Sequence, residues 1–83
     1  MSKDEILGII NEIGKEVFED ENLVINERTV AKDVKGWDSL AHLRLINEIE
    51  NKFNMKFKLK EIQCSRNVGE LISYIIQHLE ERV

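Results

Sequence analysis

The sequence predicts an all-α fold, a small four-helix bundle with three main helices, one short helix and a long loop between the first two helices. Apolar residues recur every three or four positions in three separate stretches, which is the period of an α-helix. Each stretch follows a residue that often caps a helix, namely Ser2, Asp38 or Asn67. Residues 55–60 alternate like a strand, but no second strand is available to pair with them. We therefore expect a loop and a short helical turn there.

The first helix is expected over residues 3–19. Ser2 and Glu5 have the spacing of a capping box, in which each side chain accepts a hydrogen bond from the other residue's backbone N–H. The apolar positions that follow share one helical face: Ile6, Ile10, Ile13 and Val17. Gly8 and Gly14 each cost such a helix about 1 kcal/mol relative to alanine, so its stability must come from packing.

A long ordered loop is expected from residue 20 to residue 37, where apolar residues have no helical spacing. The residues that should pin it to the helices are Leu23, Val24, Ile25, Val30 and Val34. Asp38 then caps a second helix, expected over residues 39–52, in which Ser39 is the first residue. Its apolar residues recur at helical spacing: Leu40, Leu43, Ile46, Ile49 and Phe53.

The last third of the chain should hold the short helix, over residues 60–64, and the last main helix, which starts after Asn67. Glu70 lies three positions after Asn67, which is again the spacing of a capping box. Six apolar residues are expected to meet in the core between the helices: Leu45, Ile46, Ile49, Ile62, Leu71 and Ile75. No repeat, proline or linker-like tract divides the chain, so residues 1–83 are expected to form one domain.

Composition restricts the classes of protein to which the chain can belong. A domain of 83 residues buries little more than about 60% of the surface of its unfolded chain, which leaves little room for a deep pocket. The single cysteine, Cys64, excludes an internal disulfide and a cysteine-based zinc site. Without a long apolar stretch or a secretory leader, we expect a cytoplasmic protein outside the membrane. The net charge of −4 argues against nucleic-acid binding, and we expect a monomer with protein partners.

No catalytic set of residues is recognisable, and we expect no enzymatic activity. His42 and His78 are the only histidines, and no glycine-rich phosphate loop is present. His78, near the end of the last helix, is expected to interact with the helix dipole or to face solvent. His42 lies one turn after Ser39 and is expected to be exposed, within reach of a group attached to that serine.

The run Gly36-Trp37-Asp38-Ser39-Leu40 combines a glycine turn, an aromatic residue, a capping acid and a serine hydroxyl at the start of a helix. The N-terminal end of a helix favours an attached anion, so a phosphoester on Ser39 would be accommodated there. The simpler interpretation is that Asp38 and Ser39 only begin a helix. These residues alone do not decide between the two.

The run resembles the acyl and peptidyl carrier proteins, whose members carry a 4'-phosphopantetheine arm on the serine of an Asp-Ser-Leu motif that opens the second helix. The resemblance extends over essentially the whole chain. Further matching residues are Asp33, Val34, Leu45, Ile49, Glu50, Phe53, Asn67, Val68, Gly69, Glu70, Tyr74 and Ile75. It implies a stand-alone carrier in which Ser39 bears the arm, flanked by Asp38 and Leu40, and in which the thiol of the arm holds acyl or aminoacyl groups as thioesters.

The resemblance also implies partners. A phosphopantetheinyl transferase would attach the arm, and acyl- or aminoacyl-loading and biosynthetic enzymes would use it. The residues expected to contact these enzymes are Trp37, Leu40, Arg44, Asn47, Glu48 and Ile62. The run Gly-Trp-Asp-Ser-Leu is more similar to carriers of dedicated pathways; housekeeping fatty-acid, aminoacyl or D-alanyl, and stand-alone peptidyl carriers are alternatives. Outside the family, the alternative is a helical interaction module without pantetheine.

Two charged features allow more than one interpretation. Arg44 would repel the basic docking surfaces that meet the fatty-acid-synthesis type of carrier, or would form an i,i+4 ion pair with Glu48. Four lysines between Lys52 and Lys60 either meet an acidic partner or a coenzyme A phosphate, or form a solvated loop. A core filled with branched side chains predicts at most a narrow closed cleft, which favours short or polar cargo.

Overall fold

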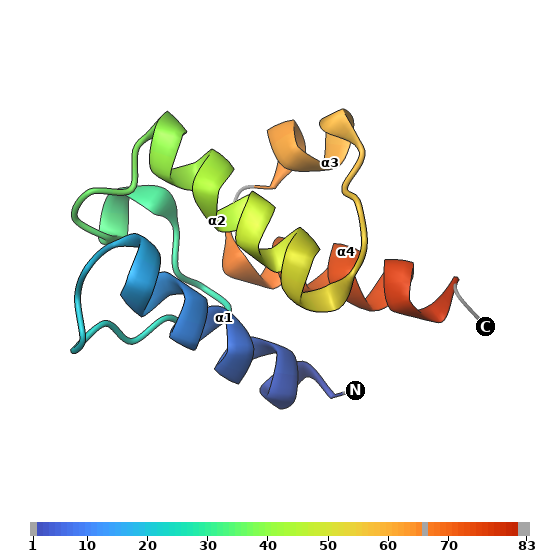
Figure 1. Cartoon of the computed structure of the whole chain (residues 1–83), viewed down its shortest axis with the longest axis horizontal. Coiled ribbons are helices and arrows are strands. Elements are labelled where there is room, and N and C mark those ends of the chain that lie inside the picture. The colour runs from blue at the N-terminus through green and yellow to red at the C-terminus, as the bar shows by residue number, and fades with distance from the viewer. Residues whose placement is uncertain (1, 66, 82–83) are drawn as a thin grey trace.

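The computed structural model describes residues 2–65 and 67–81, apart from the side chain of Cys64. Its helices are α1 (Lys3–Val17), α2 (Ser39–Phe53), α3 (Leu59–Cys64) and α4 (Val68–Glu80), with a short 3-10 turn, η1 (Ala31–Asp33), between α1 and α2. The described residues contain no strand, so the predicted all-α bundle with its short helix and long first loop is confirmed. In the view of Figure 1, α1 and α3 lie on opposite sides of α2.

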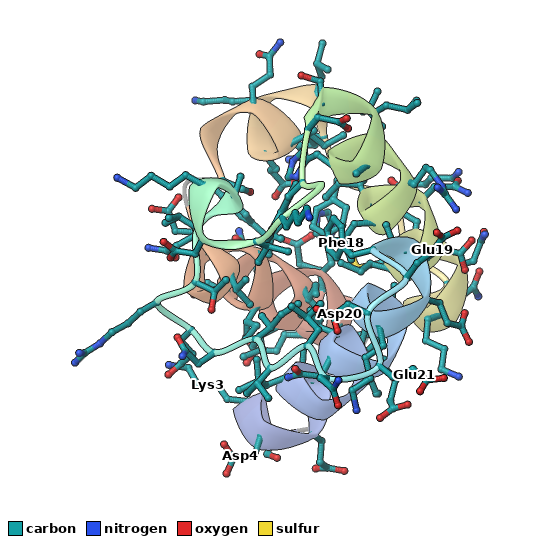
Figure 2. The ribbon with its side chains drawn as sticks, turned by 90° about the vertical axis from the view of Figure 1, so that its left-hand side faces the viewer. Lys3, Asp4, Phe18, Glu19, Asp20 and Glu21 are labelled. Atoms are coloured by element: carbon teal, nitrogen blue, oxygen red, sulfur yellow. The ribbon has the colours of Figure 1, made fainter. Side chains whose placement is uncertain are left out.

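Helix α1 ends at Val17, earlier than predicted, because the chain turns at Glu19, whose φ of 53° is left-handed. Figure 2 shows the side chains of this turn, with Phe18 toward the interior and Glu19, Asp20 and Glu21 toward solvent. At the other end of α1 the predicted capping box is present, with Glu5 and Ser2 exchanging two hydrogen bonds. The N–H of Ser2 thereby holds the pKa of the Glu5 carboxyl below its usual value.

The core lies between α1, α2 and α4. Five of the six residues predicted to meet there are buried, namely Leu45, Ile46, Ile49, Leu71 and Ile75. The sixth, Ile62, is half-buried at the edge of the core, because it lies on α3, which packs against the core from outside. Helix α1 contributes the face that its periodicity predicted, with Ile6, Ile10, Ile13 and Val17.

The stretch with strand-like alternation is the extended connection between α2 and α3. Met55 and Phe57 are buried in the core whereas Lys56 and Lys58 are exposed, so the alternation reflects one face packed against the helices. The backbone N–H of Phe57 donates a 2.9 Å hydrogen bond to Oε2 of Glu50, which takes the place of a partner strand. The prediction of a loop here is confirmed.

The long first loop is attached to α1 by the side chain of Asn11. Its Nδ2 donates to the carbonyl oxygens of Leu7 and Ile25, at 3.0 and 2.9 Å, and its Oδ1 accepts from the N–H of Ile25 at 2.6 Å. Ile25 is only 1% exposed, whereas Val24, also predicted to pin the loop, points to solvent. A Cβ on Gly14 would lie 2.8 Å from Cδ1 of Ile25, so this glycine lets the loop approach the helix.

Helix α3 is tied to α4 by a polar pair. Oε1 of Glu61 lies 2.8 Å from Nε2 of His78, and the two side chains are 12% and 15% exposed. Burial raises the pKa of Glu61, but hydrogen bonds from His78 and the backbone N–H of Lys58 outweigh it, and the pKa lies below its usual value. Of the two alternatives for His78, facing solvent is therefore wrong, because its Nε2 pairs with a carboxylate distant in sequence. An interaction with the helix dipole stays a prediction.

Candidate functional site

Ser39 is the first residue of α2 and is exposed. The chain reaches it through a turn at Gly36, whose φ of 86° would strain any residue with a Cβ. In this turn the N–H of Asp38 donates a 3.1 Å hydrogen bond to the carbonyl oxygen of Gly36. No hydrogen bond within the described residues involves the Ser39 hydroxyl, so it is available to a reagent from solvent.

Asp38 is the N-cap of α2, as predicted. Its Oδ1 accepts a 2.8 Å hydrogen bond from the N–H of Ala41, and its carbonyl oxygen accepts one from the N–H of His42 at 2.9 Å. Since Asp38 accepts hydrogen bonds from these two N–H groups of the first turn, the Ser39 hydroxyl is not needed as a cap. The cap also fixes where the helix begins, and with it the direction in which Ser39 leaves the backbone.

A hollow of about 570 Å³ opens beside Ser39. Its walls come from the start of α2, from η1, and from α3 and the residue after it: Ala31, Trp37, Asp38, Ser39, His42, Leu43, Ile62, Gln63 and Ser65. Of the residues predicted from the sequence, Trp37 and Ile62 thus lie beside Ser39. The contributions of Ala31, Gln63 and Ser65 were not predicted, because they depend on how distant segments pack.

Trp37 and His42 form a pair at this hollow. Nε1 of Trp37 donates a 3.1 Å hydrogen bond to Nδ1 of His42, and the two rings stack with centroids 6.0 Å apart. The ring of Phe18 lies 5.3 Å from that of Trp37. His42 is half-buried by these contacts, so the expectation of a simply exposed histidine is wrong.

The outward face of α2 carries the other residues predicted to contact partners. Leu40 is 69% exposed, and Arg44, Asn47 and Glu48 are exposed as well. Leu43, which the sequence had not singled out for the surface, is 56% exposed. No ion pair joins Arg44 to Glu48 within the described residues, so the structure does not support the intrahelical pair, which was one of the two interpretations of Arg44. Arg44 is free to face a partner.

Membrane spans and metal centres are absent from the part of the chain that the structure describes. None of its helices is sufficiently long and apolar to cross a bilayer. Within the same residues, no three histidine, cysteine or carboxylate side chains are grouped closely enough to hold a metal ion.

Comparison with known proteins identifies the family. No family model matches the chain. The acyl carrier protein of Rubrobacter xylanophilus is 33% identical over 79 residues, which cover 94% of this chain and 96% of that protein. The chain belongs to the acyl carrier protein family. The solution structure of the holo acyl carrier protein from Geobacter metallireducens superimposes with a TM-score of 0.84 at 36% identity, over 92% of this chain and 87% of that one.

A second solved structure, from Mycobacterium tuberculosis, has the same fold. Its TM-score is 0.77 at 24% identity, over 87% of this chain and 96% of that one. These comparisons confirm the predicted carrier family and the helical bundle. Acyl carrier proteins are carriers rather than enzymes.

Replacing Asp38 with alanine should lower the free energy of unfolding by about 0.5–2 kcal/mol, because the N–H of Ala41 loses its acceptor. It should also slow modification of Ser39, since the cap sets the orientation of that residue. Urea denaturation measures the first effect, and intact mass over time with a phosphopantetheinyl transferase measures the second. Asp38→Asn keeps an acceptor oxygen and is the matched control. A denaturation midpoint unchanged in Asp38→Ala would show that another group caps the helix.

Proposed function

We propose that this protein carries acyl or aminoacyl groups as thioesters on a 4'-phosphopantetheine arm attached to Ser39. The observation that carries the proposal is the position of Ser39, exposed at the start of a capped helix with a free hydroxyl. The neighbouring hollow of about 570 Å³ gives an attached arm a surface to lie against. The solved relative from Geobacter metallireducens is a holo acyl carrier protein, which further supports an arm on this chain.

Attachment needs coenzyme A and a phosphopantetheinyl transferase. Oγ of Ser39 attacks the β-phosphorus of coenzyme A, its proton passes to a base of the transferase, and adenosine 3',5'-bisphosphate leaves. The carboxylate of the preceding residue, Asp38, is engaged by the N–H of Ala41. The carrier therefore supplies a positioned nucleophile, and the transferase supplies the catalysis.

We propose that the biosynthetic partners dock on the outward face of α2, beside Ser39. Leu40 and Leu43 offer exposed apolar contacts there, and Arg44 adds a positive charge without an ionic partner in the described residues. A basic patch on a partner would be repelled by Arg44, which selects against enzymes that recognise an acidic helix. This surface supports a role in a dedicated biosynthetic pathway.

The small volume behind the hollow supports short or polar cargo. A small, partly open cavity of about 40 Å³ lies there, with Trp37, His42 and Leu71 among its walls. This cavity has room for a few water-sized groups at most, which is far less than a long acyl chain needs. A long acyl chain would enter the core only after the Trp37–His42 pair moved aside.

A series of acyl groups of increasing length on the arm should leave the melting temperature unchanged or lower it. Each methylene that became buried would add up to about 0.8 kcal/mol, so a sheltered chain would raise the melting temperature steadily. Circular dichroism melts measure this, with the holo protein bearing a free thiol as the reference. A steady rise out to long chains would contradict the assignment of short cargo.

A pantetheine-free interaction module is the second candidate. It is favoured by the exposed leucines of α2 and α3, which are Leu40, Leu43 and Leu59. Intact mass after incubation with coenzyme A and a transferase of broad specificity distinguishes the two functions. Wild-type protein should gain one phosphopantetheine, whereas an unchanged mass would favour the module.

A further inference from the structure

The hydrogen bond between Trp37 and His42 determines the chemistry of the imidazole. The indole nitrogen of tryptophan is only a donor, so Nδ1 of His42 must be an unprotonated acceptor. A neutral imidazole then carries its single proton on the other ring nitrogen. Neutral His42 is therefore the tautomer with a proton on Nε2.

Nε2 of His42 is not engaged by the described part of the protein, and His42 lines the hollow beside Ser39. This nitrogen has no hydrogen-bond partner within the described residues. It is not a buried atom either, since no buried side-chain nitrogen or oxygen of the described residues lacks a partner. His42 and Ser39 border the same hollow. A fixed N–H donor without a protein acceptor and a free hydroxyl thus belong to two residues that line one hollow.

We propose that Nε2–H of His42 donates a hydrogen bond to a phosphodiester oxygen of the arm on Ser39, and that Trp37 is the positioning residue that keeps this proton on Nε2. The inference rests on the proposed attachment at Ser39. His42 lies three residues further along α2, so the two Cβ atoms are about 5–6 Å apart on one side of the helix. A phosphate joined to Oγ of Ser39 is therefore within reach of the ring.

The contact would restrain only the phosphodiester, by which the arm is attached to Ser39. The phosphodiester is held beside α2, while the pantetheine beyond it stays free to move between partners. Trp37 itself is fixed by Phe18, whose ring lies 5.3 Å away, so the donor does not depend on the arm for its orientation. The pair is thus organised before the arm is attached.

Nitrogen-15 NMR of the unmodified protein tests the positioning role of Trp37. At mildly alkaline pH, where free imidazole is neutral, His42 should give a pyridine-type signal for Nδ1 and a pyrrole-type signal for Nε2. Trp37→Phe keeps an aromatic ring but removes the donor, and should shift His42 toward a mixture of both tautomers. A mixture already present in the wild type would overturn the proposal.

Phosphorus-31 NMR of the holo protein tests the contact itself. His42→Gln places an amide N–H near the position of Nε2 and should keep the wild-type shift of the phosphodiester. His42→Leu has a similar size without a donor, and should move that shift toward the value of free phosphopantetheine; Trp37→Phe should fall between them. On attachment, the Nε2 signal of His42 should move, whereas His78, already paired with Glu61, should not respond.

Intact mass is measured for every sample, so the two proposals fail separately. Wild type that gains no arm would overturn both the attachment at Ser39 and the contact from His42. Wild type that gains the arm but has the same phosphorus shift as His42→Leu would overturn the contact alone. Circular dichroism checks the fold, and if His42→Leu unfolds, the comparison of wild type with Trp37→Phe decides the outcome.

Discussion

Ser39→Ala is expected to abolish attachment of phosphopantetheine completely and to leave the helical fold unchanged. The hydroxyl is the proposed nucleophile, so its removal takes away the atom to which phosphorus bonds. It makes no hydrogen bond within the described residues, and alanine is favourable in a helix, so stability should stay the same or rise slightly. Intact mass after incubation with coenzyme A and the transferase measures the first effect, and circular dichroism the second.

Ser73→Ala is the matched control for this experiment. Ser73 is also an exposed serine on a helix, where its hydroxyl donates to the carbonyl oxygen of Gly69 at 3.1 Å. Its loss should leave the modification intact. If Ser39→Ala still gained the arm, another residue would be the attachment site, and if it unfolded, the serine would have a structural role that its exposure does not suggest.

Asn11→Ala should be the most destabilising of the polar substitutions considered, by about 2–4 kcal/mol. The side chain pairs with both the N–H and the carbonyl oxygen of Ile25, a residue buried in the core. Removing it leaves two backbone groups near the core without partners, each costing about 1–3 kcal/mol. Urea denaturation measures the loss, and amide hydrogen exchange at Ile25 should become faster.

Asn47→Ala provides the comparison for Asn11. Asn47 is exposed on α2, so its replacement should change the free energy of unfolding by less than about 0.5 kcal/mol. Equal denaturation midpoints for the two variants would show that the contact between Asn11 and Ile25 contributes nothing to stability. The first loop would then be held by its apolar residues alone.

The helix starts were predictable because their signals are local. Ser2, Asp38 and Asn67 each accept a hydrogen bond from a backbone N–H three residues later, which needs only a short stretch of sequence. The position of Ser39 as the first residue of α2 was predictable from the same stretch, because Asp38, the N-cap, directly precedes it. Apolar periodicity likewise identified the buried face of α1 correctly.

Contacts between distant segments were not predictable. The pairing of Asn11 with Ile25 spans 14 residues and that of Glu61 with His78 spans 17, and neither has a spacing that a helix or turn would impose. Apolar periodicity also did not predict that Leu43 is exposed. The spacing of apolar residues along α2 does not determine which side of this helix the other helices cover. The hollow at Ser39 depends on α3, whose position is itself set by such contacts.

The polar tie of α3 has a consequence for how the molecule opens. Six residues are too few for a helix to persist alone. Among the side chains of α3 that the structure describes, only half-buried Ile62 packs against the core. Releasing Glu61 from His78 would let this segment detach while the apolar interior of α1, α2 and α4 stays closed. Local opening of α3, which forms part of the wall beside Ser39, should therefore cost less free energy than global unfolding. Access to the buried interior next to the serine is a sub-global fluctuation, separable from the stability of the fold as a whole.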